Sequence, residues 1–214
     1  MSSTLTAVHK ACSAQATVAS PLGPILLART AKGLAGAWFE GQKHHPGTLV
    51  APELPDDPLL ASAAKQLRAY FAGESARFDV PLDLQGTPFQ RAVWQALLCI
   101  APGALSSYGA IAATIGSPSA VRAVGGAVGR NPVSVIVPCH RVVGRDGSMT
   151  GYAGGVQRKQ ALLALERALE RALERAFGSP TAPARGDAFK AANAEDDVGA
   201  DVGADAGPHA GSPA

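Results

Sequence analysis

The sequence predicts a mixed α/β protein, with a small N-terminal part built from a β-sheet and a helix and a mainly helical C-terminal part that contains a helix-turn-helix. Three observations predict it. β-compatible runs punctuated by Pro and Gly fill residues 16–39, helical patterns recur from residue 59 onward, and Ala, Gly, Pro and Asp dominate after residue 178. We divide the chain into 1–84, 85–177 and an acidic tail, 178–214, which we expect to be disordered.

The first part is predicted to contain three short strands and one helix. AlaThrValAlaSer, IleLeuLeuAlaArg and LeuAlaGlyAlaTrpPhe are β-compatible and are separated by turn residues, which indicates a small antiparallel sheet. A helix over 59–71 follows, because apolar residues recur at helical spacing: Leu60, Ala64, Leu67 and Phe71.

Helices account for most of the second part. Thr87 precedes an apolar-faced helix and is suited to cap it. From Leu162 the unit AlaLeuGluArg recurs three times, which predicts a long C-terminal helix with leucines along one stripe.

Two further short helices are predicted between these. Ser106 or Ser107 can cap a helix over 108–115, and Ser119 can cap another over 120–128. Their tight, Gly-containing connection suggests a helix-turn-helix, although paired helices in any α-rich core look the same.

Charge is distributed unevenly along the chain. Residues 84–159 contain seven basic residues and one acid, whereas residues 179–214 carry a net charge of −4. A segment this basic suits a polyanion, because each neutralised phosphate releases a counterion. A merely solvated basic face fits the charge count equally well.

The cysteines favour neither a disulfide framework nor a structural zinc site. Cys12, Cys99 and Cys139 form no CxxC pair, and no histidine lies at zinc-finger spacing. Cys99 lies in an apolar run, so we expect it in the core. We see no signal-peptide segment and no apolar run long enough to span a bilayer, and we expect a cytoplasmic protein that does not enter a membrane.

The segment around Cys139 carries the chemistry. We expect the run Val133–Val137 to form a strand, with Pro138 ending its ladder and Cys139 presented at the strand end. His140 and Arg141 follow at once, and cationic neighbours favour the nucleophilic thiolate. Taken alone, a Cys-His pair more often marks a buried cysteine beside a capping histidine.

Six motifs, in this order, resemble the methylated-DNA–protein-cysteine methyltransferase family, whose members are also called O6-alkylguanine-DNA alkyltransferases. They are SerTyrGly (107–109), ArgAlaValGlyGlyAla (122–127), AsnPro (131–132), ProCysHisArgVal (138–142), GlyTyrAlaGlyGly (151–155) and LysGlnAlaLeuLeuAlaLeuGlu (159–166). The match runs from about Thr87 to Glu166 without an evident gap. The stretch before residue 40 matches more loosely, and the resemblance implies a ribonuclease H-like N-terminal domain.

The resemblance implies direct-reversal DNA repair on one cysteine. Cys139 is the expected alkyl acceptor, His140 the base acting through an ordered water, and Glu166 the group that orients His140. Glu170 and Glu174 occupy equivalent places in the repeat. We choose Glu166 because it alone keeps the family's interval from the preceding motif.

Further roles follow from the same resemblance. Asn131 is expected to brace the active-site turn through its amide, and Tyr108 to donate to guanine N3 as the base leaves. We expect no metal and no cofactor, and one use per molecule, because the thioether has no leaving route. The expected partner is double-stranded DNA carrying O6-alkylguanine or O4-alkylthymine, bound by a monomer.

The second helix of the pair presents small residues to DNA. In the family this helix enters the minor groove, and Arg122 fills the gap that the flipped base leaves. The predicted DNA contacts are Ala120, Arg122, Ala123, Gly125, Arg130 and Arg141. The predicted base pocket consists of Tyr108, Val142, Met149, Tyr152, Ala153 and Gly154. Some relatives carry serine where Ala153 stands, so a hydroxyl contact to the base is absent here.

Three other functions compete with this one. Lesion-binding relatives lack the acceptor cysteine, whereas Cys139 is present here. Regulatory relatives add a metal-binding cysteine cluster, which this chain lacks. A cysteine hydrolase is not excluded by an adjacent Cys-His pair.

Overall fold

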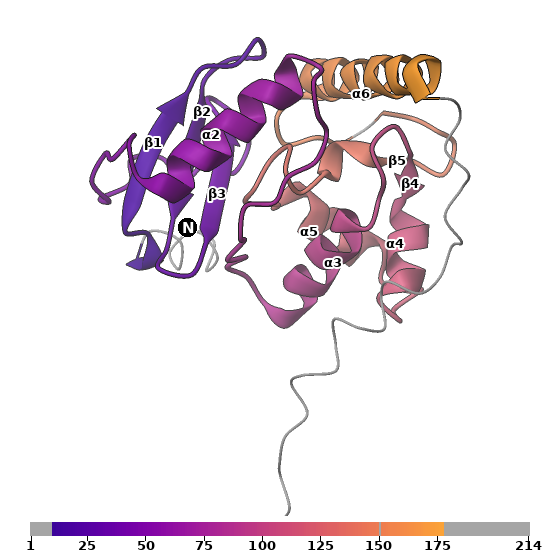
Figure 1. The fold of residues 1–214 in the computed structure, drawn as a ribbon. Coiled ribbons are helices and arrows are strands. Elements are labelled where there is room, and N and C mark those ends of the chain that lie inside the picture. Colours follow the sequence, from indigo (N-terminus) through magenta and orange to yellow (C-terminus); the bar gives the residue numbers. More distant parts are fainter. Residues whose placement is uncertain (1–9, 150, 178–214) are drawn as a thin grey trace, which may run out of the picture. The chain divides into compact units, whose positions relative to one another are not determined.

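The computed structural model describes residues 10–149 and 151–177, and its elements confirm a mixed α/β fold with an N-terminal sheet followed by a helical part (Figure 1). In chain order they are β1 (Ala14–Val18), β2 (Ile25–Arg29), β3 (Leu34–Phe39), α2 (Pro58–Phe71), α3 (Pro88–Leu98), β4 (Ser106–Ser107), α4 (Tyr108–Thr114), α5 (Val121–Gly129), the 3-10 helix η1 (Cys139–Arg141), β5 (Val142–Val143) and α6 (Val156–Phe177). The predicted tail, 178–214, lies outside the described residues.

The N-terminal sheet is antiparallel, as predicted; its strand order is β1-β2-β3, and α2 lies across it (Figure 1). Asp57 caps α2 by accepting from the backbone N–H groups of Leu59 and Leu60. The helix buries one stripe against the sheet, which includes Leu67 and Tyr70. Tyr70 brings a hydroxyl into the interior at the C-terminal end of this helix.

Of the three helix caps predicted for the second part, two are confirmed; the last helix, α6, begins at Val156, before the predicted Leu162. Thr87 and Gln90 form a complete capping box at α3. Ser107 caps α4 by accepting from the N–H of Ala110. The prediction that Ser119 caps the next helix is wrong, because α5 begins one residue later, with Ala120 at its N-cap and no side-chain cap.

The predicted strand Val133–Val137 is also wrong. Only Val133 bridges to β3, through Ala37, and the chain then turns with Val135 at φ +72°. The N–H of Val137 bonds back to the carbonyl of Val133 at 2.9 Å, which closes the turn. Cys139 therefore opens η1 instead of ending a strand.

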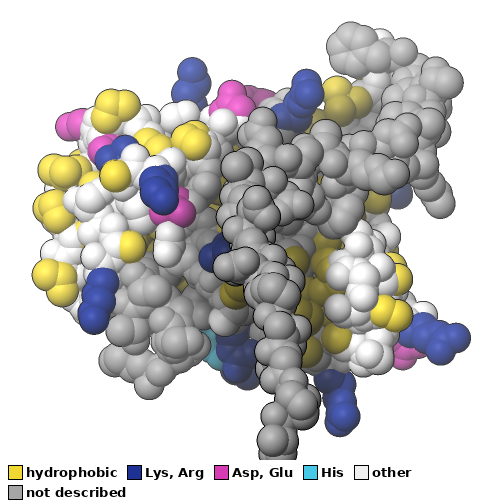
Figure 2. Space-filling view, turned by 90° about the horizontal axis from the view of Figure 1, so that it is seen from below, with side chains coloured by type: hydrophobic (Ala, Val, Ile, Leu, Met, Phe, Trp, Pro, Cys, Tyr) yellow, Lys and Arg dark blue, Asp and Glu magenta, His cyan; other side chains and the backbone are white. Residues whose placement is uncertain are grey.

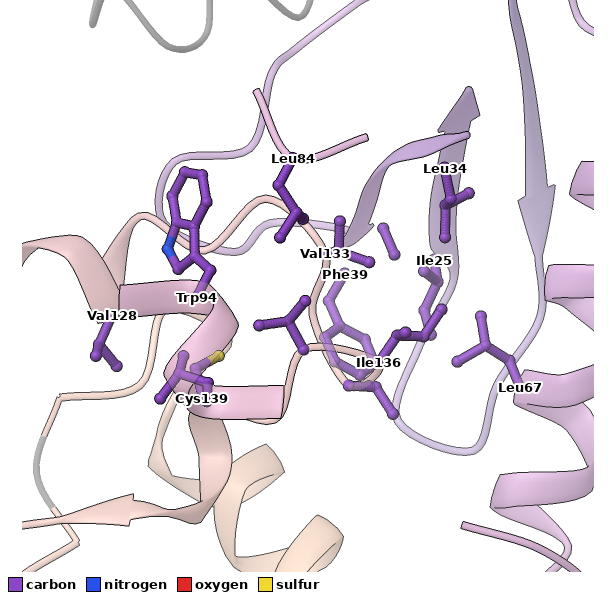
Figure 3. Packing of buried hydrophobic residues seen from close by; sticks show 14 of the residues in the cluster. Ile25, Leu34, Phe39, Leu67, Leu84, Trp94, Val128, Val133, Ile136 and Cys139 are labelled. Atoms are coloured by element: carbon purple, nitrogen blue, oxygen red, sulfur yellow. The ribbon is translucent and has the colours of Figure 1, made fainter. Parts of the chain in front are cut away.

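One hydrophobic core runs from the sheet to the helices (Figure 3). In this view Ile25 and Leu67 lie on one side and Trp94 and Cys139 on the other, with Val133, Phe39 and Ile136 between them. The boundary at residue 84 stays a prediction. Cys99, expected in this core, is exposed at the end of α3, so that expectation is wrong.

Candidate active site

Cys139 is buried and is contacted directly by Asn131. Only 4% of Cys139 is exposed, and the Asn131 Nδ2 atom donates to its Sγ at 3.0 Å. The same nitrogen donates to the Val137 carbonyl at 2.8 Å, while Oδ1 accepts from the Val133 N–H at 3.0 Å. Asn131 thus holds both ends of the turn and touches the sulfur.

His140 is fully buried and faces a carboxylate. Its Nε2 atom lies 2.8 Å from Glu166 Oε1. Burial lowers the His140 pKa, and this effect outweighs the opposing influence of Glu166, so the ring is neutral at neutral pH. The carboxylate needs a donor, which assigns the ring proton to Nε2 and leaves a lone pair on Nδ1. Within the described part of the chain Nδ1 has no hydrogen-bond partner.

Glu166 is held as an anion by donors from three parts of the chain. Arg141 donates to both carboxylate oxygens, at 2.9 and 2.8 Å, and Tyr70 donates to Oε1 at 2.9 Å. The Gly103 N–H donates to Oε2 at 3.2 Å. Burial alone would raise the Glu166 pKa, but the bonds from His140 and Arg141 outweigh it and hold that pKa well below its usual range.

Burial raises the pKa of the Cys139 thiol to about 11, against the opposing effects of Asn131 and Lys159. The resting group is therefore a thiol and not the thiolate expected from its cationic neighbours. Arg141 is committed to Glu166, and His140 is neutral. The cation that favours ionisation is the fully buried Lys159, whose Nζ donates to the Val142 carbonyl at 2.6 Å.

The structure places the six predicted base-binding residues in three different settings. Tyr108 is half-buried, and a Cβ atom added to Gly151 would lie 3.3 Å from its hydroxyl oxygen, so the two face each other closely. Tyr152 and Ala153 line a cavity of about 420 Å³. Val142 and Gly154 are buried and Met149 is half-buried, and none of these three lines that cavity.

Most of the predicted DNA contacts lie at the surface. Arg122, Ala123 and Arg130 are exposed, whereas Ala120 and Gly125 are half-buried. The exception is Arg141, which is 5% exposed and bonded to Glu166 and to the Ile100 carbonyl. A DNA contact by Arg141 does not fit this placement, because its guanidinium neutralises a buried carboxylate.

Sequence reasoning missed two side chains of the site. Tyr70 lies 96 residues before its partner Glu166, on a helix for which the sequence gives only a packing stripe. Lys159 is the second, and a lysine at the start of an amphipathic helix normally points to solvent. Helical spacing could have indicated that Lys159 is buried, because it lies on the same helix face as Leu162 and Glu166, three and seven residues further along.

Among the described residues no group of His, Cys, Asp and Glu side chains is arranged to hold a metal ion. Within the same residues no helix has both the length and the apolar character to cross a membrane.

The fold and the site together define the class of this protein. It is an α/β protein in two parts, and its helical part holds a buried Cys-His-Glu-Asn cluster beside a pair of short helices. Residues 14–84 match the family profile described as 6-O-methylguanine DNA methyltransferase, ribonuclease-like domain, and residues 88–168 match that of the DNA binding domain. The chain belongs to the 6-O-methylguanine DNA methyltransferase family, as the motifs predicted.

Similar proteins cover most of the chain. The methylated-DNA–protein-cysteine methyltransferase of Mycobacterium tuberculosis is 50% identical over 151 residues, which is 71% of this chain and 90% of that protein. The protein of the same name from Methanosarcina acetivorans is 48% identical over 153 residues, covering 69% and 94%. The crystal structure of Mycobacterium tuberculosis OGT in complex with DNA is 47% identical, with a TM-score of 0.66, covering 73% and 94%.

Proposed function

We propose that this enzyme repairs alkylated DNA by moving the alkyl group of O6-alkylguanine to the Sγ atom of its own Cys139. The observation that carries this proposal is the neutral, buried His140, oriented by an anionic Glu166, next to a buried thiol. Family membership and the similar methyltransferases support the same activity.

The first step is removal of the thiol proton. Cys139 is almost wholly protonated at neutral pH, so it needs a base to become nucleophilic. The proton passes through a water to Nδ1 of His140, whose Nε2–H stays on Glu166. The sulfur then gains its negative charge beside the Asn131 N–H and the Lys159 ammonium, both of which stabilise that charge.

The second step is the displacement. The Cys139 sulfur attacks the alkyl carbon, an S–C bond forms, and the bond between that carbon and guanine O6 breaks. The Tyr108 hydroxyl donates a hydrogen bond to N3 and stabilises the departing guanine anion, which takes up one proton from solvent at N1. His140 releases to solvent the proton that it took from the thiol, so the protons balance. The products are an S-alkylcysteine and ordinary guanine.

The thioether on Cys139 offers no route by which the alkyl group can leave. Each molecule therefore acts once. We further propose that the protein acts as a monomer, without a cofactor, in the cytoplasm. O4-alkylthymine is a second substrate, because it presents the same kind of alkyl–oxygen bond to the sulfur.

Access to the lesion requires that the base leave the duplex. The exposed surface of α5 consists largely of small residues, which allows close approach to the minor groove, and α4 and α5 act as a helix-turn-helix. Arg122 is the long, exposed side chain on that surface and occupies the gap left by the flipped base.

Incubation with a duplex containing one O6-methylguanine tests the proposal. Intact-mass spectrometry should show one added methyl group per protein molecule, together with loss of the lesion from the DNA. Cys139→Ala should bind the duplex as well as the unaltered protein and gain no methyl group. An unchanged mass with the lesion intact would contradict the proposal and would favour a lesion-binding protein without repair activity.

A further inference from the structure

A second binding element lies beside the proposed base pocket. The cavity of about 420 Å³ that contains Tyr152 and Ala153 is also lined by Lys43 and His44, from the loop after β3, and by Arg130 at the end of α5. The DNA contacts predicted from the sequence all lie within residues 120–141. They assign no role to the loop between β3 and α2.

The loop is held in place against the site. Gln42 is 5% exposed, and its Oε1 accepts from the Phe39 N–H at 2.9 Å and from the Ser134 hydroxyl at 3.1 Å. The Lys43 N–H donates to the Ala153 carbonyl at 2.9 Å, which joins the loop to the segment 151–153. These bonds fix the backbone from which the Lys43 and His44 side chains extend before any ligand binds.

The cavity gathers positive charge. Among the described residues that line it, Lys43 and Arg130 are cationic, His44 is a neutral ring that becomes cationic on protonation, and none is acidic. Burial lowers the His44 pKa, and Arg130 and Lys43 lower it further, which places the three groups within electrostatic reach of one another. Such a cluster is unfavourable by itself and becomes favourable when an anion joins it.

A view from below shows part of a histidine side chain beside a Lys or Arg side chain (Figure 2). His44 adopts a φ of +62°, which is uncommon for a residue other than glycine. The backbone conformation turns the loop back at this point, between Lys43 and the buried Pro46.

We propose that Lys43 and His44, together with Arg130, bind a backbone phosphate of the DNA strand that carries the lesion. This inference rests on the proposed function, because the cavity shares Tyr152 and Ala153 with the pocket for the flipped base. When the base enters the protein, its sugar and phosphates stay at the pocket mouth, where cationic groups neutralise them. The N-terminal part of the chain thus takes part in holding the extruded nucleotide.

The first test measures DNA affinity in the Cys139→Ala background, which stops the reaction. Lys43→Gln/His44→Gln should weaken binding to O6-methylguanine duplex by about tenfold and reduce the slope of log affinity against log salt by about 1. Lys65→Gln is the matched control, since it removes one lysine charge from an exposed position on α2 and should change affinity less than about twofold. Equal affinity and slope in the variant and the control would overturn the proposal.

The second test replaces single phosphates. Duplexes with an uncharged methylphosphonate at one linkage next to the lesion should lose affinity for the protein that retains Lys43 and His44. At the linkage whose phosphate binds in the cavity, the methylphosphonate should not lower the affinity of Lys43→Gln/His44→Gln any further, because this variant has already lost the contact. If each flanking linkage cost both proteins the same affinity, the phosphate contact would be refuted.

These readouts separate the two proposals. Failure of unaltered protein to gain a methyl group from the duplex contradicts the alkyl transfer and leaves the phosphate contact to be judged by affinity alone. Full alkyl transfer with no effect of the loop variant on affinity contradicts only the phosphate contact.

Discussion

The two halves of α6 carry the same four-residue unit in opposite surroundings. Glu166, Glu170 and Glu174 each occupy the third place of an AlaLeuGluArg unit. Glu166 is 1% exposed and bonded to His140, Arg141 and Tyr70, whereas Glu170 and Glu174 are exposed. The same local sequence therefore gives a buried anion in one turn and solvated carboxylates in the next two. Contacts with residues distant in sequence determine which of the three glutamates is buried.

The largest effect is expected for Glu166→Gln. The substitution leaves the buried Arg141 without its counter-charge, which should cost about 3–5 kcal/mol of unfolding free energy. It also removes the group that fixes the His140 tautomer, so alkyl transfer should slow by at least about 100-fold. Urea unfolding and single-turnover kinetics measure the two losses. A variant as stable and fast as the unaltered protein would show that Glu166 is no different from Glu170.

Lower pH should slow alkyl transfer. The His140 pKa is lowered below its ordinary 6.5, so the base stays neutral at pH 7 and the rate should fall as pH decreases through that lowered pKa, by about tenfold per unit. Stability has the same sign: groups with depressed folded-state pKa values stabilise the protein above their ordinary pKa. The unfolding free energy should decline below pH 6.5 for His140 and below pH 4.5 for Glu166. A rate that rises on acidification would contradict the role of His140 as base.

Replacement of Asn131 tests the other neighbour of the sulfur. Asn131→Ala removes the donor to Cys139 and the bonds that close the turn, all of them buried. Unfolding free energy should fall by about 1–3 kcal/mol, and the pH at which the thiol reacts with an alkylating reagent should rise. An unaltered reactivity profile would mean that Asn131 supports the turn only.

Tyr70→Phe should have a smaller effect. It keeps the ring that packs against Phe71 and Phe78 and removes one donor from Glu166, at a cost of about 1 kcal/mol. With fewer donors Glu166 attracts the His140 proton more strongly, so the acid limb of the pH–rate profile should move to higher pH. A loss of stability without any shift of that limb would indicate a purely structural tyrosine.

The smallest effect is expected at the exposed glutamates. Glu170→Gln and Glu174→Gln should each change the unfolding free energy by less than about 0.5 kcal/mol and leave alkyl transfer unchanged. They are matched controls for Glu166→Gln, since all three substitutions are chemically identical. A loss of stability or of alkyl transfer in either variant would contradict the conclusion that Glu166 alone of the three glutamates belongs to the site.

Much of the site could be predicted because its motifs are local. Cys139, His140 and Asn131 lie within ten consecutive residues, and the interval that the resemblance to the family implies selected Glu166 from three glutamates. The choice of Glu166 agrees with the geometry that joins it to His140. The antiparallel sheet and two of the helix caps were also predicted, because turn and capping residues act on their own neighbours.

The remainder depends on contacts that no local pattern encodes. Valine strongly disfavours a positive φ, so nothing in the run 133–137 predicted the turn at Val135. The inward path of Arg141 follows from its partner Glu166, and Tyr70 reaches the same carboxylate from an N-terminal helix. Cys99 is exposed because it lies at the C-terminal end of α3, although its sequence neighbours are apolar.

Peptide mapping after reaction identifies the cysteine that accepts the alkyl group. The protein has three cysteines, of which Cys99 is exposed and Cys12 is half-buried. After incubation with duplex that carries an isotopically labelled O6-methylguanine, we predict that the label is found on the peptide containing Cys139 and that the Cys12 and Cys99 peptides are unlabelled. Label on the Cys99 peptide would contradict the assignment of Cys139 as the acceptor. Unlabelled protein, together with DNA that has kept all of its labelled methyl groups, would contradict alkyl transfer itself.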